Sequence, residues 1–118
     1  MPPSPRCKRG DVVLVLFPNS DLRTARPRPA LVVQTDDLRT GLPQVVVAMM
    51  SARMFRANHP SRVPVLAQSP AGQQSGVLSD SVVMTDNLAT VLESAVSRVI
   101  GSLPMAEVDL ALRHTLGL

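Results

Sequence analysis

Short apolar runs rich in valine recur along the chain, separated by polar segments that contain Gly, Pro, Asn or Asp. Such runs are typical of β-strands, because β-branched side chains fit the pleated surface and the intervening residues favour turns. Several runs are continuous rather than alternating, which predicts strands covered on both faces, as in a small closed barrel. The expected strands are Val12–Phe17, Ala30–Val33, Val45–Met50, Val63–Leu66, Val82–Met84 and Val96–Ile100.

Proline and glycine add detail to this pattern. Pro64 has no N–H to donate to a strand ladder, so the run Val63–Leu66 is expected at a sheet edge. The polar stretches Asp36–Leu42 and Gln68–Gly76 are expected to form turns or mobile loops. No internal repeat is visible in the sequence.

Only the C-terminal tail has a clear helical period. Pro104 suits the first turn of this helix, and Gly117 suits its end. A shorter helix is also considered around Asn87–Ala95. The apolar face of the C-terminal helix is expected to pack on the core first and to serve as a dimer seam second, and it comprises Met105, Val108, Leu112 and Leu116. The pattern therefore predicts a mainly β protein with helices (α+β), a barrel closed by a C-terminal α-helix.

The length of 118 residues is that of one domain. Residues 1–9 are basic and rich in proline, which predicts a flexible N-terminal arm before a single domain at 10–118. Cys7 is the only cysteine, so an intrachain disulfide is impossible and a reducing compartment is natural. The N-terminus lacks the apolar segment of a signal peptide, and no run approaches membrane-spanning length. We therefore expect a cytoplasmic protein with no membrane partner.

Charge is distributed unevenly between the two halves. Residues 1–62 hold ten Arg/Lys and four Asp/Glu, whereas residues 63–118 hold two and five. A basic half on a small domain indicates an anionic partner, of which nucleic acid is the commonest, although a solvated arginine-rich surface without a partner is the alternative. The chain has no Trp or Tyr and only two Phe. If RNA binds, its bases would therefore be recognised mostly by arginine stacking and hydrogen bonds.

The stretch Phe17–Val33 is the most informative part of the chain. An apolar run ends in a polar, proline-rich loop with three arginines and resumes at Ala30. Arg28 precedes Pro29, which favours extended backbone, so we expect Arg28 to head a strand with its side chain held in place. Its planar fork of donors suits a phosphate. A solvated arginine at a strand edge is the alternative.

Four parts of the chain, in order, resemble the MazF/PemK (Kid)-type toxin endoribonucleases. Any single part is weak evidence for the resemblance. The four parts in the same order and with family-like spacing, over roughly residues 8–118, are strong evidence. The first part is Gly10–Val15, Phe17–Pro18, Asp21–Leu22 and Arg28–Val33; the others are Ala48–Arg53, then Ser75–Leu78 with Ser81–Val91, and Ile100–Leu103 with the helical tail.

The resemblance implies an SH3-like β-barrel homodimer that cleaves single-stranded RNA at a short sequence, with no metal or other cofactor. It also implies 2′,3′-cyclic phosphate and 5′-hydroxyl ends, and a cognate antitoxin protein that blocks the RNA groove. No pattern typical of a metal site, a nucleotide-binding loop or a protease triad competes with this interpretation.

The resemblance places the family's catalytic arginine at Arg28 and its catalytic hydroxyl at Ser51. Ser51 could instead simply end a strand. Asp86 matches a catalytic aspartate of the PemK branch, but Met84 stands where that branch has a second arginine. Asp86 could equally be a turn or helix-cap residue. An arginine guanidinium is not deprotonated in proteins, so it suits charge stabilisation better than proton transfer.

The remaining site predictions concern the general base and the substrate contacts. His59 and Asp86 are the candidates for the base, although a surface histidine is the ordinary interpretation of His59. His114 is expected to be structural, near the end of the last helix. Substrate contacts are predicted at Asn19, Arg23, Arg26, Arg53, Thr85 and Asn87.

Two other functions are considered. A gyrase poison of the CcdB type shares this barrel, but that group works through an aromatic tip on its C-terminal helix, and the tail His114–Leu118 has no tryptophan. A non-catalytic relative that binds RNA or an antitoxin as part of a repressor is the other alternative. Met84 is the best argument for it.

Overall fold

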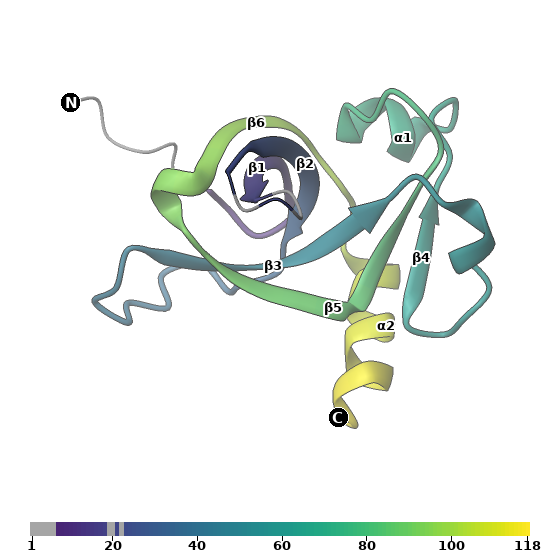
Figure 1. Ribbon diagram of the computed structural model, residues 1–118. Coiled ribbons are helices and arrows are strands. Elements are labelled where there is room, and N and C mark those ends of the chain that lie inside the picture. Colours follow the sequence, from purple (N-terminus) through teal and green to yellow (C-terminus); the bar gives the residue numbers. More distant parts are fainter. Residues whose placement is uncertain (1–6, 19–20, 22) are drawn as a thin grey trace.

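One antiparallel sheet holds all the strands of the described chain, in the spatial order β4-β5-β3-β2-β1-β6 (Figure 1). The computed structural model describes residues 7–18, 21 and 23–118. Each apolar run expected to be a strand overlaps one of the observed strands. The strands are β1 (Asp11–Pro18), β2 (Ala25–Val32), β3 (Gln44–Ser51), β4 (Arg62–Val65), β5 (Ser81–Leu92) and β6 (Val96–Ser102). The helical elements are η1 (Met54–Arg56), α1 (Pro70–Ser75), η2 (Glu93–Ala95) and α2 (Ala106–Leu116).

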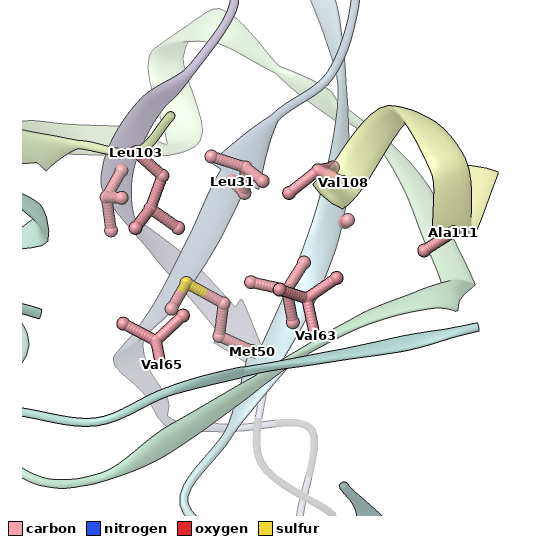
Figure 2. Packing of buried hydrophobic residues seen from close by; sticks show 10 residues of the cluster. Leu31, Met50, Val63, Val65, Leu103, Val108 and Ala111 are labelled. Carbon is pink, nitrogen blue, oxygen red and sulfur yellow. The ribbon is translucent and has the colours of Figure 1, made fainter. Parts of the chain in front are cut away.

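Both faces of the sheet are covered by apolar side chains. Successive residues of a strand point to opposite faces, so Val12 of β1 joins one buried cluster while Val13 and Val15 join the other. The first cluster lies under α2, and Figure 2 shows Val108 of this helix close to Leu31 of β2. The prediction of strands buried on both faces is therefore confirmed, and it explains why the runs are continuous.

The sheet is not closed, so the predicted closed barrel is not confirmed. Its edge strands are β4 and β6, and no ladder joins them in the part of the chain that the structure describes. Each edge strand instead has a helix packed against it, since α1 contacts β6 whereas α2 contacts β4 and β5. The expected edge position of Pro64 is confirmed, since its strand pairs with β5 alone.

The prediction of a loop at Gln68–Gly76 is wrong, because this segment contains α1. The Ser69 side chain caps the helix by accepting a hydrogen bond of 3.0 Å from the Gly72 N–H. Pro70 occupies the first turn, and Gly76 ends the helix with a left-handed φ of 78°. The capping signals were present in the sequence, but the polar composition hid them.

The shorter helix considered around Asn87–Ala95 is also wrong, because β5 continues as a strand to Leu92. The ladder between β3 and β5 changes register abruptly: Ala48 pairs with Leu88, and Met49 pairs with Met84. The residues of β5 between Met84 and Leu88 therefore form a bulge. Bulges redirect side chains, and this one presents Asp86 and Asn87 at the surface.

The predicted C-terminal helix is confirmed as α2, which ends at Gly117 in a left-handed conformation. Pro104 lies before the helix rather than in its first turn, since Met105 is the cap residue. Val108 is buried and Met105 and Leu112 pack against the core, as expected, whereas Leu116 is exposed. No helix of the described chain is long and apolar enough to cross a membrane.

The predicted N-terminal arm is only partly described, since residues 1–6 lie outside the described residues. Arg9, the last residue of that arm, is fixed to the domain. Its Nε donates to the Val33 carbonyl at 3.1 Å, its backbone N–H donates to Asp36, and its Nη2 pairs with Asp109 at 2.6 Å. Arg9 therefore belongs structurally with the folded domain.

Candidate functional site

A groove of about 1010 Å³ crosses the molecule between β2, the end of β3, the segment before β5, and β6. Its lining, taken over the described residues, contains no Asp or Glu. None of its arginines forms an ion pair with the described part of the chain. The uncompensated positive charge suits a polyanion, because such a groove concentrates positive potential. The arginines that line the groove are Arg26, Arg28, Arg53, Arg56 and Arg98.

Arg28 lies in the middle of β2, opposite Val15 of β1, and not at the start of the strand as predicted. The expected extended backbone is present. Its side chain is exposed and makes no hydrogen bond or ion pair with the described residues, so the structure does not show it held in place. An exposed guanidinium with all its donors available can engage two oxygens of one phosphate.

Ser51 is the last residue of β3 and lines the same groove as Arg28. Its Oγ accepts a hydrogen bond of 3.1 Å from the Arg53 N–H. A hydroxyl that accepts in this way keeps its own hydrogen available for donation. Ser51 can therefore donate to an anion in the groove.

Asp86 does not line this groove; it faces an adjoining hollow of about 440 Å³. Its carboxylate accepts two hydrogen bonds from Arg62, at 2.9 Å from Nε and 2.7 Å from Nη2. The Nη1 of Arg62 also donates to the Arg56 carbonyl at 2.8 Å. The hydrogen bonds from Arg62 lower the pKa of Asp86. A carboxylate held in its ionised form by an arginine is a weak base.

The predicted substrate contacts divide into four groups. Arg26, Arg53 and Asn87 line the groove together with Arg28 and Ser51. Arg23 is exposed in the loop before β2 but is not part of the groove lining. Asn19 lies outside the described residues.

Thr85, the remaining predicted contact, is fully buried. Its Oγ1 donates to the Ser61 carbonyl at 2.7 Å and lies 2.7 Å from the Thr115 hydroxyl of α2. These bonds connect β5 to the start of β4 and to the C-terminal helix. The side chain is therefore not accessible to a ligand in this structure.

His59, the other candidate base, also lies outside the groove lining. Its Nδ1 lies 2.7 Å from the Ser61 hydroxyl and accepts from the Ser61 N–H at 3.1 Å. Its ring makes an edge contact with His114 of α2, with 6.0 Å between the ring centres. Of the groups in the described chain, neither candidate base shares the groove with Arg28.

Sequence reasoning missed two arginines of the groove, Arg56 and Arg98. Arg98 could have been placed at the surface from the sequence, because it is a charged residue inside an apolar run and must point away from the core. Nothing in the sequence singles out Arg56. Its Nη1 lies 3.9 Å from Sδ of Met84, which is itself nearly buried. Among the described residues, no three His, Cys, Asp or Glu side chains come together as a metal site.

Comparison with known proteins gives a family and several similar structures. The profile of the family described as "PemK-like, MazF-like toxin of type II toxin-antitoxin system" matches residues 8–116. No curated protein is significantly similar to the chain. A mycobacterial endoribonuclease solved with its cognate antitoxin is similar, with 21% identity, a TM-score of 0.72, and 96% of this chain and 97% of that chain covered.

Two further solved structures are similar over nearly their whole length. The Mycobacterium tuberculosis toxin MazF-mt6 shares 23% identity at a TM-score of 0.70, covering 92% of this chain and 97% of that one. A MazE–MazF structure from Deinococcus radiodurans shares 22% identity at a TM-score of 0.71, covering 95% and 97%. These structures share the fold of this chain.

Proposed function

Since the chain belongs to the PemK-like, MazF-like toxins of type II toxin–antitoxin systems, we propose that it is an endoribonuclease toxin that cleaves single-stranded RNA in the arginine-lined groove. The observation that carries this proposal is the groove itself. It brings Arg28, the Ser51 hydroxyl and four more arginines together, and no carboxylate of the described residues lines it. Such a lining neutralises several phosphates of one strand and leaves a hydroxyl donor beside them.

The reaction we propose uses the 2′-hydroxyl of the RNA as the nucleophile. The 2′-oxygen forms a bond to phosphorus, the bond from phosphorus to the 5′-oxygen breaks, and the products carry a 2′,3′-cyclic phosphate and a 5′-hydroxyl. Negative charge builds up on the non-bridging oxygens of the crowded phosphoryl group. Arg28 binds two of these oxygens with its fork, and Ser51 donates to one of them. A charged, bidentate donor such as Arg28 is worth about 10²–10³ in rate.

Two proton transfers accompany the reaction, one from the 2′-hydroxyl and one to the 5′-oxygen. The groove arginines stabilise charge rather than transfer protons, because an arginine guanidinium is not deprotonated in proteins. The pairing with Arg62 lowers the pKa of Asp86 and makes it a weak base. We therefore assign charge stabilisation and positioning to the groove side chains and the proton transfers to solvent water, with no metal or other cofactor.

Two protein partners are proposed, a second copy of the chain and an antitoxin. We propose that two copies form a homodimer, which widens the surface available to RNA. An acidic, partly disordered antitoxin would then occupy the groove, with Asp or Glu side chains in place of phosphates and an apolar anchor, folding as it binds.

The proposal is tested by incubating the purified protein with a long RNA of defined sequence in excess EDTA and mapping the ends. We expect cleavage at a short recurring sequence. The 3′ ends should resist ligation until the cyclic phosphate is opened. Strict dependence on added magnesium would contradict the metal-free reaction. RNA that is bound but never cut would favour the alternative of a non-catalytic binding protein, for which the best argument is Met84 in place of the second arginine of the PemK branch.

A further inference from the structure

We propose that the hollow beside the groove binds one nucleobase of the RNA, stacked on the ring of Phe55, so that this hollow reads sequence while the groove binds phosphate. The inference rests on the proposed function, because it names a base-binding subsite for the same RNA. The hollow is lined by Phe55, Arg56, Arg62, Met84, Asp86 and Asn87.

Phe55 is placed as a stacking surface. The chain has only two aromatic residues besides histidine, and the other one, Phe17, packs against a buried cluster. Phe55 instead is 79% exposed at the surface, in the short helix η1. The guanidinium carbon of Arg56 lies 5.7 Å from the ring centre, which orients the ring. Unstacked RNA bases bind to aromatic faces of this kind.

The hollow adjoins the groove, because Arg56, Met84 and Asn87 line both. A nucleotide whose phosphate binds the groove arginines therefore has its base within reach of Phe55. The nearly buried Met84 forms an apolar part of the wall they share, and such a surface suits the flat, poorly solvated face of a base.

The bulge in β5 supplies groups for the edge of the base. Arg62 holds the Asp86 carboxylate with a hydrogen bond to each oxygen. Each oxygen keeps a further lone pair for an N–H group. The exposed Asn87 amide adds a donor and an acceptor. The hollow therefore favours a base whose edge presents an N–H donor beside Asp86.

The absence of Trp and Tyr from the sequence makes a direct binding test feasible. The variant Phe55→Trp places a single fluorophore in the hollow. We expect a 2′-O-methylated RNA oligomer, which cannot be cleaved, to quench this fluorescence strongly. An abasic oligomer of the same length should bind the groove with little quenching. The control Leu110→Trp, at an exposed position of α2, should respond to neither oligomer.

The effect on sequence choice is tested with a randomised RNA pool. Phe55→Leu keeps an apolar side chain but removes the aromatic face, so we expect cleavage to weaken by about 10-fold, chiefly through KM. The preference at one position near the cut should also be lost, while the preferences at other positions persist. The separate variant Phe55→Trp keeps an aromatic face at this position and should retain the preference. A purely structural role would change the rate without changing the sequence profile.

The outcomes separate this inference from the proposed function. If labelled RNA binds and is cut while the fluorescence of the Phe55→Trp variant does not change, or changes equally with abasic RNA, the base-binding hollow is wrong and the endoribonuclease proposal stands. If Phe55→Leu leaves every position of the cleavage profile unchanged, the inference is again wrong. If the wild-type protein neither binds nor cuts RNA, the proposed function itself fails.

Discussion

The arginines of this chain fall into two kinds according to their partners. Arg9 and Arg62 are each paired with a carboxylate, Asp109 and Asp86, and both also donate to backbone carbonyls. These arginines hold the fold together. Arg28, like the other arginines of the groove, has no such partner in the described chain. Its donors remain available for a ligand.

The sequence could not separate these two kinds of arginine. Arg9 and Asp109 lie 100 positions apart, and Arg62 and Asp86 lie 24 apart. Only the fold shows which arginine meets which carboxylate. The resemblance to a known family assigned Arg28 and Ser51 to one site, and both line the groove, but it could not show that Arg62 holds Asp86 outside the groove lining.

The hydroxyl of Ser51 gives a prediction at this scale. Ser51→Ala removes the donor to the phosphate and the acceptor for the Arg53 N–H, so we expect cleavage to fall by about 10-fold. Ser51→Thr keeps the hydroxyl and should be tolerated. The measurement is the initial rate of cleavage of a defined RNA. Equal rates for the alanine and wild-type proteins would exclude a role for this hydroxyl.

The pairing of Asp86 with Arg62 predicts a pH dependence of stability. The hydrogen bonds from Arg62 lower the pKa of Asp86 in the folded chain, below an unfolded value of about 3.9. The stabilisation is therefore fully present above that value and is lost as the pH falls through the folded pKa. We expect Asp86→Asn to be less stable than the wild type near neutral pH, and the difference to shrink towards about pH 2.

Urea denaturation of both proteins across this pH range measures the effect. A stability difference that stays constant from neutral to acidic pH would show that the ion pair does not contribute as described.

Secondary-structure elements were predictable where burial determined the pattern. Continuous valine-rich runs gave the strands, and the helical period of the tail gave α2. The bulge in β5 was not predictable, because its residues look like those of an ordinary turn and only pairing with β3 shows the change of register. The same limit applies to α1, a polar helix that is stabilised by its caps and by packing on β6.

The contact between α1 and β6 gives a prediction at the scale of elements. A Cβ at Gly76 would lie 2.2 Å from the Ile100 carbonyl oxygen, whereas a Cβ at Gly41 would meet nothing within 4 Å. Both glycines have a similar positive φ, 78° and 81°. Gly41→Ala should therefore show the backbone cost alone, about 1–2 kcal/mol. Gly76→Ala should cost about 1–3 kcal/mol more, because atoms must also move apart.

Chemical denaturation of the two glycine variants and the wild type gives the comparison. Equal destabilisation by Gly76→Ala and Gly41→Ala would mean that α1 does not pack tightly on β6.

At the scale of the whole molecule, the uneven charge of the sequence has a structural counterpart. Most of the groove arginines come from the basic half of the chain, and Arg98 joins them from the acidic half across the sheet. A surface rich in positive charge was therefore predictable from composition, whereas the shape of the groove was not. The open sheet was not predictable either, because closure depends on whether helices or a ladder cover β4 and β6.

The proposed partners predict different responses to salt. RNA binding releases counterions from many phosphates, so its affinity should fall steeply as salt rises. The affinity of the antitoxin should fall less, because its apolar anchor is insensitive to ionic strength. Titrations of both ligands at several salt concentrations, with sedimentation to establish the dimer, measure this. A monomer that cleaves RNA at micromolar concentration would contradict the dimer. An antitoxin that binds without displacing RNA would contradict groove occlusion.

The most direct test of the central claim, that RNA is cleaved in the arginine-lined groove, compares the wild type with Arg28→Lys, Arg28→Ala and Arg113→Lys. The measurement is the cleavage rate of one defined RNA in excess EDTA. Arg28→Lys keeps the charge but loses the bidentate fork, so we predict a fall of about 100-fold or more with the fold retained. Arg113→Lys, the same exchange at an exposed position of α2, should cleave like the wild type. Near-normal cleavage by Arg28→Lys and by Arg28→Ala would show that the active site lies elsewhere.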